Sequence, residues 1–235
     1  GVGIRATKIG LEVFTPAQLT VMRFGVACSA ALWVPRPRLP LATLLAIGLT
    51  LFTGQFLLQF YGVTLGMPAG LTSVVSQSQA LFTVALAAVV LRERPSVQQA
   101  TGMLIAVVGL IIIGAALGLA IPLLAFLVTL CSALSWAIGN VLVKRLPPTD
   151  MLSLMVWASI VPPLPALALS LALDPPASIP TAIERATWLH WSVPVYLGLV
   201  ASVIAYSIWG RLLRRYPSGA VAPFALLAPC VGTLT

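Results

Sequence analysis

Charged side chains are scarce in this chain. Lys, Arg, Asp and Glu make up only 8% of its 235 residues, whereas soluble domains contain about 25%. Hydrophobic residues make up 60% of the sequence, and the mean hydropathy is +1.06. A water-facing surface of ordinary size cannot be built from this composition, so an ordinary soluble domain is excluded.

Cysteine and histidine are too few for a disulfide framework or a metal centre. Cys28, Cys131 and Cys230 are far apart and lie within apolar runs, which predicts inert buried thiols. His190 is the only histidine, and its two tryptophan neighbours indicate an anchor at the membrane interface rather than a base. We therefore expect no metal and no cofactor.

Motifs of nucleotide and metal chemistry are also missing. The sequence has no Gly-x-x-x-x-Gly-Lys-Ser/Thr loop, no His-Glu-x-x-His and no pair of carboxylates inside an apolar run. These absences argue against an ATP-driven motor, a membrane-embedded protease and a metal-dependent lipid enzyme. The sequence therefore predicts a protein that is not an enzyme.

Long apolar runs dominate what the chain does contain. A helix needs about 20 apolar residues to cross the hydrocarbon core of a bilayer. The runs are continuous rather than alternating, which makes barrel strands improbable and predicts an all-α polytopic membrane protein. The expected helices lie at residues 1–14, 16–34, 41–62, 68–91, 97–117, 121–143, 151–173, 190–210 and 217–235.

Basic residues gather at every second boundary between these runs. Cytoplasmic loops are enriched in Lys and Arg, so the clusters predict cytoplasmic loops in a bacterial inner membrane, with Ser178 outside. The net charge of +8 then needs no nucleic-acid partner. The clusters, which hold nine of the 13 basic residues, are Arg36 and Arg38, Arg92 and Arg94, Lys144 and Arg145, and Arg211, Arg214 and Arg215.

The chain also repeats itself. Residues 61–70 resemble residues 209–219, and residues 3–8 align with residues 139–144. The two registers, about 149 and 136 residues apart, predict two five-helix units, at 1–117 and 121–235. Because five is odd, the second unit enters the membrane from the opposite side. Such an inverted repeat places a transporter's substrate site near the midplane, where the halves meet.

Several short motifs resemble those of one family. They are the stretch WAIGNVLVK from Trp136 to Lys144, Met22-Arg23-Phe24, and Leu91-Arg92-Glu93-Arg94-Pro95. These motifs are similar to those of the EamA-type drug/metabolite transporter superfamily, and the chain looks most like its bacterial amino-acid exporters of the YddG kind. The resemblance implies ten helices in two inverted five-helix halves, about nine of them in this sequence, and export of small metabolites. Gly3 and Ile4 stand where the family commonly has Asn and an aromatic residue.

Amide and aromatic side chains in the expected helices predict the substrate site. They suggest an amphipathic cavity that hydrogen-bonds a zwitterion and stacks a planar or apolar side chain. Any single aromatic could instead belong to the core or to an interfacial belt, and nearby Ser and Thr could be interhelical glue. The candidate residues are Gln55, Gln59, Gln77, Gln79, Trp136, Asn140, Tyr206 and Trp209.

Ionisable residues inside the expected helices are few. Arg5, Lys8 and Glu12 share one helical face. Arg5 is predicted to meet a substrate carboxylate, whereas Lys8 could do the same or pair with Glu12. Arg23 is expected to be structural, neutralised by helix ends or neighbouring polar groups, and Lys144 to be only a flank that snorkels.

Prolines are concentrated in the second half of the chain. Pro162, Pro163 and Pro165 remove backbone donors from the seventh expected helix and kink it. Static membrane helices contain kinks too, but this concentration, with Pro223 and Pro229 in the ninth helix, fits helices that bend during gating. One GxxxG spacing is too common to predict a dimer, so a monomer is expected.

Together these features predict an inner-membrane secondary transporter. It would export amino acids, with aromatic or neutral ones as candidates, and related small metabolites by alternating access. A broad-specificity drug or sugar-metabolite carrier is the alternative within transport. A membrane-embedded lipid-modifying enzyme would need a clustered acid, base or metal constellation, and a scaffold subunit would lack a hydrated central cavity. The expected partners are the lipid bilayer and a small-molecule substrate.

Overall fold

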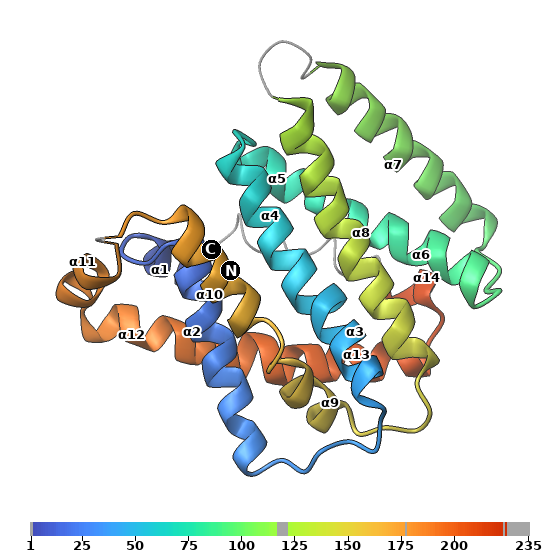
Figure 1. Ribbon diagram of the computed structural model, residues 1–235. Coiled ribbons are helices and arrows are strands. Elements are labelled where there is room, and N and C mark those ends of the chain that lie inside the picture. The colour runs from blue at the N-terminus through green and yellow to red at the C-terminus, as the bar shows by residue number, and fades with distance from the viewer. Residues whose placement is uncertain (1, 117–121, 177, 223, 225–235) are drawn as a thin grey trace.

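The chain folds into a bundle of helices (Figure 1). The computed structural model describes residues 2–116, 122–176, 178–222 and 224. Within them, five helical stretches are long and apolar enough to cross a membrane: Leu41–Thr64, Leu71–Val90, Leu123–Arg145, Met151–Leu173 and Trp188–Arg215. The prediction of an all-α polytopic membrane protein is confirmed.

The first half of the chain contains five helical stretches. The first two are α1 (Val2–Leu11) and α2 (Pro16–Ser29), with a 3-10 turn, η1 (Ala30–Leu32), after α2. The third consists of α3 (Leu41–Ile47), a π-helical segment, η2 (Gly48–Gly54), and α4 (Gln55–Thr64). The fourth is α5 (Ala69–Ser76) and α6 (Ser78–Val90), and the fifth is α7 (Val97–Ala116). The predicted boundary between the halves, 117–121, lies outside the described residues.

The second half begins with the long helix α8 (Leu123–Arg145). Next come α9 (Met151–Ala158), α10 (Pro163–Leu173) and a short helix that the sequence analysis did not predict, α11 (Ser178–Arg185). The stretch after it consists of α12 (Trp188–Val195), the π-helical segment η3 (Tyr196–Ile204) and α13 (Ala205–Arg215), and α14 (Ser218–Val221) follows.

Local chemistry explains where several helices begin and end. Thr15 and Gln18 form a reciprocal capping box at the start of α2, with Pro16 in the first turn. Asp150 caps α9 by accepting a hydrogen bond from the backbone N–H of Ser153. The seventh expected helix is interrupted between α9 and α10, because Pro163 lacks the N–H that would continue the helical ladder.

The two π-helical segments occupy corresponding places in the chain. Segment η3 begins 148 residues after η2, which is close to the offset of the sequence repeat. In each segment a glycine allows a close approach to the other half. A Cβ at Gly48 would lie 2.7 Å from the carbonyl oxygen of Ala158, and one at Gly198 would lie 2.5 Å from that of Arg23. Any side chain at either position would push these backbones apart.

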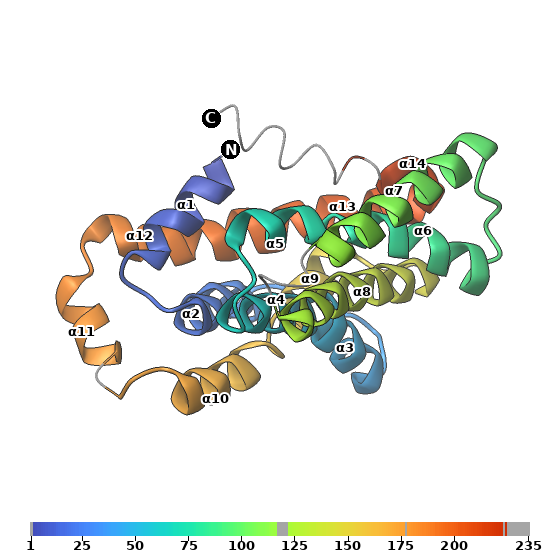
Figure 2. The ribbon, with the colours of Figure 1, turned by 90° about the horizontal axis from the view of Figure 1, so that it is seen from above.

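The two halves are interleaved rather than side by side. Helix α8 of the second half packs against α4, α5 and α6 of the first, and α2 of the first half packs against α10, α12 and η3 of the second (Figures 1 and 2). The main apolar core lies where these elements meet and includes Phe24, Leu51, Phe52, Met155 and Val203.

The outward faces of the bundle are as apolar as its core. Leu104 and Ile105 on α7 and Leu164 and Leu171 on α10 are exposed, as expected where lipid replaces water. Cys131 on α8 is exposed too, so its predicted burial is wrong, whereas Cys28 is partly buried and Cys230 lies outside the described residues. In such a protein an apolar sequence context does not distinguish the core from the lipid face.

Candidate substrate site

Polar and aromatic side chains from both halves meet at the centre of the bundle. The Tyr206 hydroxyl on α13 donates a hydrogen bond to Gln55 Oε1 on α4 at 3.2 Å. The indole N–H of Trp209, also on α13, donates to Asn140 Oδ1 on α8 at 3.1 Å. The structure therefore brings together four of the predicted site residues, and we call this group, with Trp136, the central cluster.

Aromatic rings form the walls of the central cluster. The rings of Trp136 and Trp209 lie 5.4 Å apart, and the Phe52 ring meets Tyr206 edge-on at 5.1 Å. Phe24 continues the stack, 5.1 Å from Phe52. Offset and edge-to-face pairs of this kind stabilise packing and also present flat apolar surfaces beside polar groups.

Asn140 is the polar centre of this arrangement. Its side chain is almost fully buried, and besides accepting from Trp209 it donates through Nδ2 to Thr83 Oγ1 at 3.3 Å. Asn140 thus joins α8 to α13 and to α6 of the other half. Buried amides are normally satisfied in this way, and a partner left without its hydrogen bond is costly.

The remaining glutamines do not all converge on the cluster. Gln59, one turn after Gln55, donates through Nε2 to Ser76 Oγ on α5 at 3.2 Å, whereas the side chain of Gln79 makes no hydrogen bond to any described residue. Gln77 lies at the break between α5 and α6 and lines a cavity of about 570 Å³ bordered by α5, α6 and α7. The structure therefore does not place Gln77 with the others, because the break changes the face that it occupies.

Of the charged side chains predicted on one face of the first helix, the structure describes only one. The side chains of Arg5 and Lys8 lie outside the described part of the structure, and so do Pro223 and Pro229 in the ninth expected helix. The Glu12 carboxylate lies 4.0 Å from Nε2 of His190, whose ring also completes the cap of α12 with Thr187.

Arg23, which the sequence analysis expected to be held by helix ends or neighbouring polar groups, contacts one hydroxyl and two aromatic rings. Its guanidinium lies 4.4 Å from the centre of the Phe56 ring and 5.3 Å from that of Phe24, and its Nε donates to Ser202 Oγ at 2.6 Å. These contacts bring a cation of the first half against η3 of the second. The signal available in the sequence was an arginine in the middle of an apolar run.

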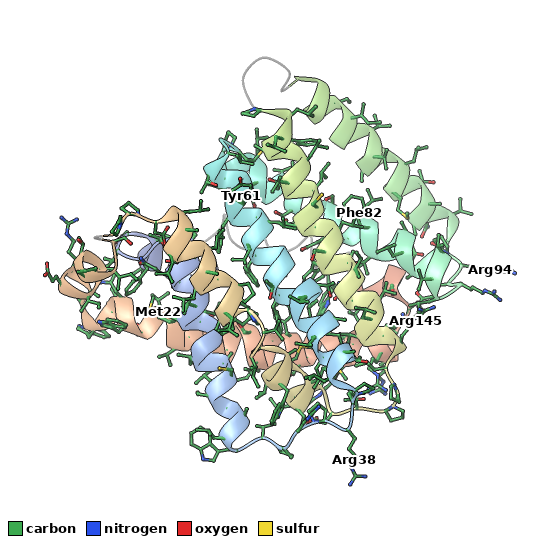
Figure 3. All side chains as sticks on the ribbon, viewed as in Figure 1. Met22, Arg38, Tyr61, Phe82, Arg94 and Arg145 are labelled. Carbon is green, nitrogen blue, oxygen red and sulfur yellow. The ribbon has the colours of Figure 1, made fainter. Side chains whose placement is uncertain are left out.

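One end of the bundle carries clusters of basic residues, and we call it the basic end. Figure 3 shows Arg38, Arg94 and Arg145 along the lower right margin, away from Tyr61. There Lys144 forms an ion pair with Glu93, so it is not merely a snorkelling flank. This pair joins α8 to the connection between α6 and α7.

The segment that precedes α14 is tied to this ion pair. Lys144 also donates to the carbonyl of Tyr216 and to Ser218 Oγ, each at 3.0 Å, and the Ser218 N–H donates to Glu93 Oε2 at 2.8 Å. Partial burial by itself would raise the pKa of Glu93. The hydrogen bonds from Lys144 and Ser218 and the charge of Lys144 outweigh that effect and hold the pKa below its ordinary value.

Hydrogen bonds also connect the halves at the opposite end. Thr15 Oγ1 at the start of α2 donates to Asp174 Oδ2 at 2.6 Å, and Asp174 caps the end of α10. Gln18 Nε2 donates to Ser178 Oγ at 2.9 Å. The central cluster therefore lies between two sets of contacts, each joining the first half to the second.

Comparison with known proteins identifies the family. Residues 1–115 match the model of the EamA-like transporter family. A Salmonella typhimurium protein named a probable amino-acid metabolite efflux pump is 41% identical over 99% of this chain and 80% of its own length. This chain belongs to the EamA-like transporter family. An Escherichia coli protein of the same name is 36% identical over the same shares.

Other matches to this EamA-like transporter are more distant. A Streptantibioticus cattleyicolor protein named a probable terminal-alkyne amino-acid exporter is 30% identical over 96% of this chain and 76% of its own. A solved crystal structure matches 96% of this chain and 82% of its own with a TM-score of 0.68, but at 19% identity it shows the fold alone. The family predicted from the sequence motifs is confirmed.

Proposed function

We propose that this EamA-like transporter exports amino acids and related small metabolites across the bacterial inner membrane by alternating access, without chemical change to its cargo. The observation that carries the proposal is the central cluster, where Gln55 pairs with Tyr206 and Asn140 pairs with Thr83 across the two halves. The names of three relatives, two probable amino-acid metabolite efflux pumps and one probable terminal-alkyne amino-acid exporter, support the substrate class.

The groups in the central cluster suit a zwitterion with an apolar side chain. Amide, hydroxyl and indole groups can hydrogen-bond the ammonium and carboxylate groups, and the rings of Trp136, Trp209 and Phe52 offer flat surfaces for the side chain. These polar groups now bond one another, so a substrate must replace those hydrogen bonds. That exchange favours ligands with several polar groups at one end.

The repeat supplies the two bodies that alternate, one at 1–117 and the other at 121–235. Support for this division comes from the corresponding places of η2 and η3 and from the reciprocal packing of Gly48 and Gly198. Rocking of the halves would break the Lys144–Glu93 contacts in one state and the Thr15–Asp174 contact in the other. In that scheme the transporter works as a monomer.

The orientation of the transporter is tested by labelling single cysteines in sealed cells, in a background lacking the three native thiols. We expect cysteines placed next to Arg38, Arg92 and Lys144 to react only after the membrane is opened, and one at Ser178 to react from outside, because Lys and Arg are retained in cytoplasmic loops. External labelling beside Arg92 would overturn this topology.

The gap between α9 and α10 predicts a kinetic role for Pro163. Pro163→Ala restores one of the backbone N–H groups missing from this interruption and should stiffen it, so transport should slow more than substrate binding weakens. Comparing rates and affinities in proteoliposomes checks this, with Pro147→Ala in an exposed connection as the control. An equal loss of rate and affinity, or loss of folded protein, would indicate a purely structural proline.

The proposed function itself is tested by counterflow in proteoliposomes. Vesicles loaded with one unlabelled amino acid should accumulate the same labelled amino acid transiently and saturably, and a panel of amino acids should reveal the preferred side chain. Protein-free vesicles provide the control. If no amino acid exchanges while drugs or sugar metabolites do, the substrate class proposed here is wrong.

A further inference from the structure

Arg23 is a fixed cation beside the central cluster. It lies in the middle of α2, where its Nε donates to the fully buried hydroxyl of Ser202. That hydroxyl in turn donates to the carbonyl of Leu197 in the π-helical segment η3 at 2.8 Å. An arginine guanidinium is not deprotonated in proteins, so a full positive charge is held in one orientation at this place.

No carboxylate of this sequence neutralises Arg23. All five acidic residues belong to the described part of the structure, and none of them forms an ion pair with it. A charge at membrane depth is costly unless it meets a partner or a cavity. The acidic residues have other places: Glu12 beside His190, Glu93 beside Lys144, Asp150 at the start of α9, Asp174 at the end of α10 and Glu184 on α11.

The free part of the guanidinium is the part that recognises carboxylates. Nε is engaged by Ser202, and the plane of the group lies over the Phe56 ring. The terminal nitrogens have no hydrogen-bond acceptor among the described residues, although their N–H fork matches a carboxylate in two parallel bonds.

Arg23 is also connected to the residues that would hold the rest of the substrate. Phe24, its neighbour on α2, stacks on Phe52, and Phe52 stacks on Tyr206, the partner of Gln55. One cation therefore lies next to neutral amides and aromatic faces.

We propose that Arg23 binds the carboxylate of the transported amino acid, with Ser202 as the residue that orients its guanidinium. The inference rests on the proposed function and extends it, because it makes a free carboxylate a requirement for substrates. The ammonium group is then left to the neutral amides and the aromatic faces of the central cluster. This assignment replaces the sequence-based choice of Arg5 for the same role.

The test compares a transported amino acid with its carboxamide and its decarboxylated amine as competitors in the counterflow assay. On the wild-type protein, loss of the carboxylate should weaken competition by about 10- to 150-fold, the range given by hydrogen bonds to charged groups. Arg23→Gln should weaken competition by the amino acid by a similar factor and leave competition by the carboxamide unchanged. Arg23→Lys should show an intermediate loss of competition by the amino acid. Arg38→Gln, in an exposed connection, is the matched control and should behave as wild type.

The outcomes separate this inference from the function on which it rests. Wild-type protein that exchanges no amino acid contradicts the proposed function. If the wild-type protein exchanges amino acids but binds the carboxamide equally well, the proposed role of Arg23 is contradicted. An unchanged preference of Arg23→Gln for the amino acid over its carboxamide contradicts it too. If Arg23→Gln does not fold, Ser202→Ala replaces it. A reduced preference for acid over amide then supports the proposal, and an undiminished preference overturns it.

Discussion

Replacing Asn140 by Ala should weaken amino-acid binding by roughly 5- to 150-fold, because a buried hydrogen bond left unmade costs about 1–3 kcal/mol. The change leaves the Trp209 indole N–H without its acceptor and removes the bond that Thr83 Oγ1 accepts, at the junction of α6, α8 and α13. Binding of labelled amino acid to purified protein measures the effect, and the yield of folded protein should stay near normal. All amino acids should be affected alike, because the amide would meet the backbone groups that they share.

Ser132→Ala is the matched control for this variant. Ser132 lies on the same face of α8 two turns earlier and is equally buried, but its hydroxyl bonds only the Thr129 carbonyl of its own helix. Removing the Ser132 hydroxyl should change the affinity for amino acids little. In a double-mutant cycle, Asn140→Ala and Trp209→Phe should be strongly non-additive. Normal binding by Asn140→Ala would mean that the substrate site lies elsewhere.

Glu93→Gln should open the basic end of the transporter. The substitution removes the ion pair with Lys144 and weakens the bond from the Ser218 N–H. Hydrogen bonds to charged groups are worth about 1.5–3 kcal/mol, which corresponds to a shift of about 10- to 150-fold between two states when the contact exists in only one of them. Reactivity of a single cysteine at Val221, which is buried on α14 and takes no part in these contacts, towards a thiol reagent measures the shift.

The pH dependence of the wild type follows from the lowered pKa of Glu93. A carboxylate with a lowered pKa keeps its contact above the ordinary glutamate range and loses it as the pH falls through that lowered value. With Glu93 intact, the single cysteine should therefore become as reactive as in Glu93→Gln only when the pH falls below the ordinary pKa range of glutamate. Glu184→Gln on exposed α11 provides the control. If Glu93→Gln is no more reactive than wild type, the ion pair does not hold this end closed.

Compositional signals were sufficient for the long helical stretches of this protein, although not for the short helix α11. Continuous apolar runs located the long stretches, and the three prolines marked the interruption that separates α9 from α10. Amide and aromatic side chains within the expected helices predicted the site, and the structure brings together Gln55, Asn140, Tyr206 and Trp209. Each of these features depends on local sequence.

Other features depend on contacts between distant segments. The π-helical segments η2 and η3 carry no periodic signal, and Gln77 at the break lines the cavity bordered by α5, α6 and α7. The partner of Lys144 is 51 residues away, at the end of a different helix. The role that we propose for Arg23 rests on where the structure places all five acidic side chains. A sequence shows that a buried charge exists but not what faces it.

The most direct test of the account is substrate protection of a cysteine next to Gln59, which lies one turn along α4 from Gln55 of the central cluster. Ser76→Cys, in a chain whose native thiols are replaced by Ala, places the thiol next to Gln59. In sealed proteoliposomes, an impermeant thiol reagent should reach it, and a saturating transported amino acid should slow the reaction several-fold while an untransported one should not. A reaction rate that no amino acid changes would contradict a substrate site shared between the two halves.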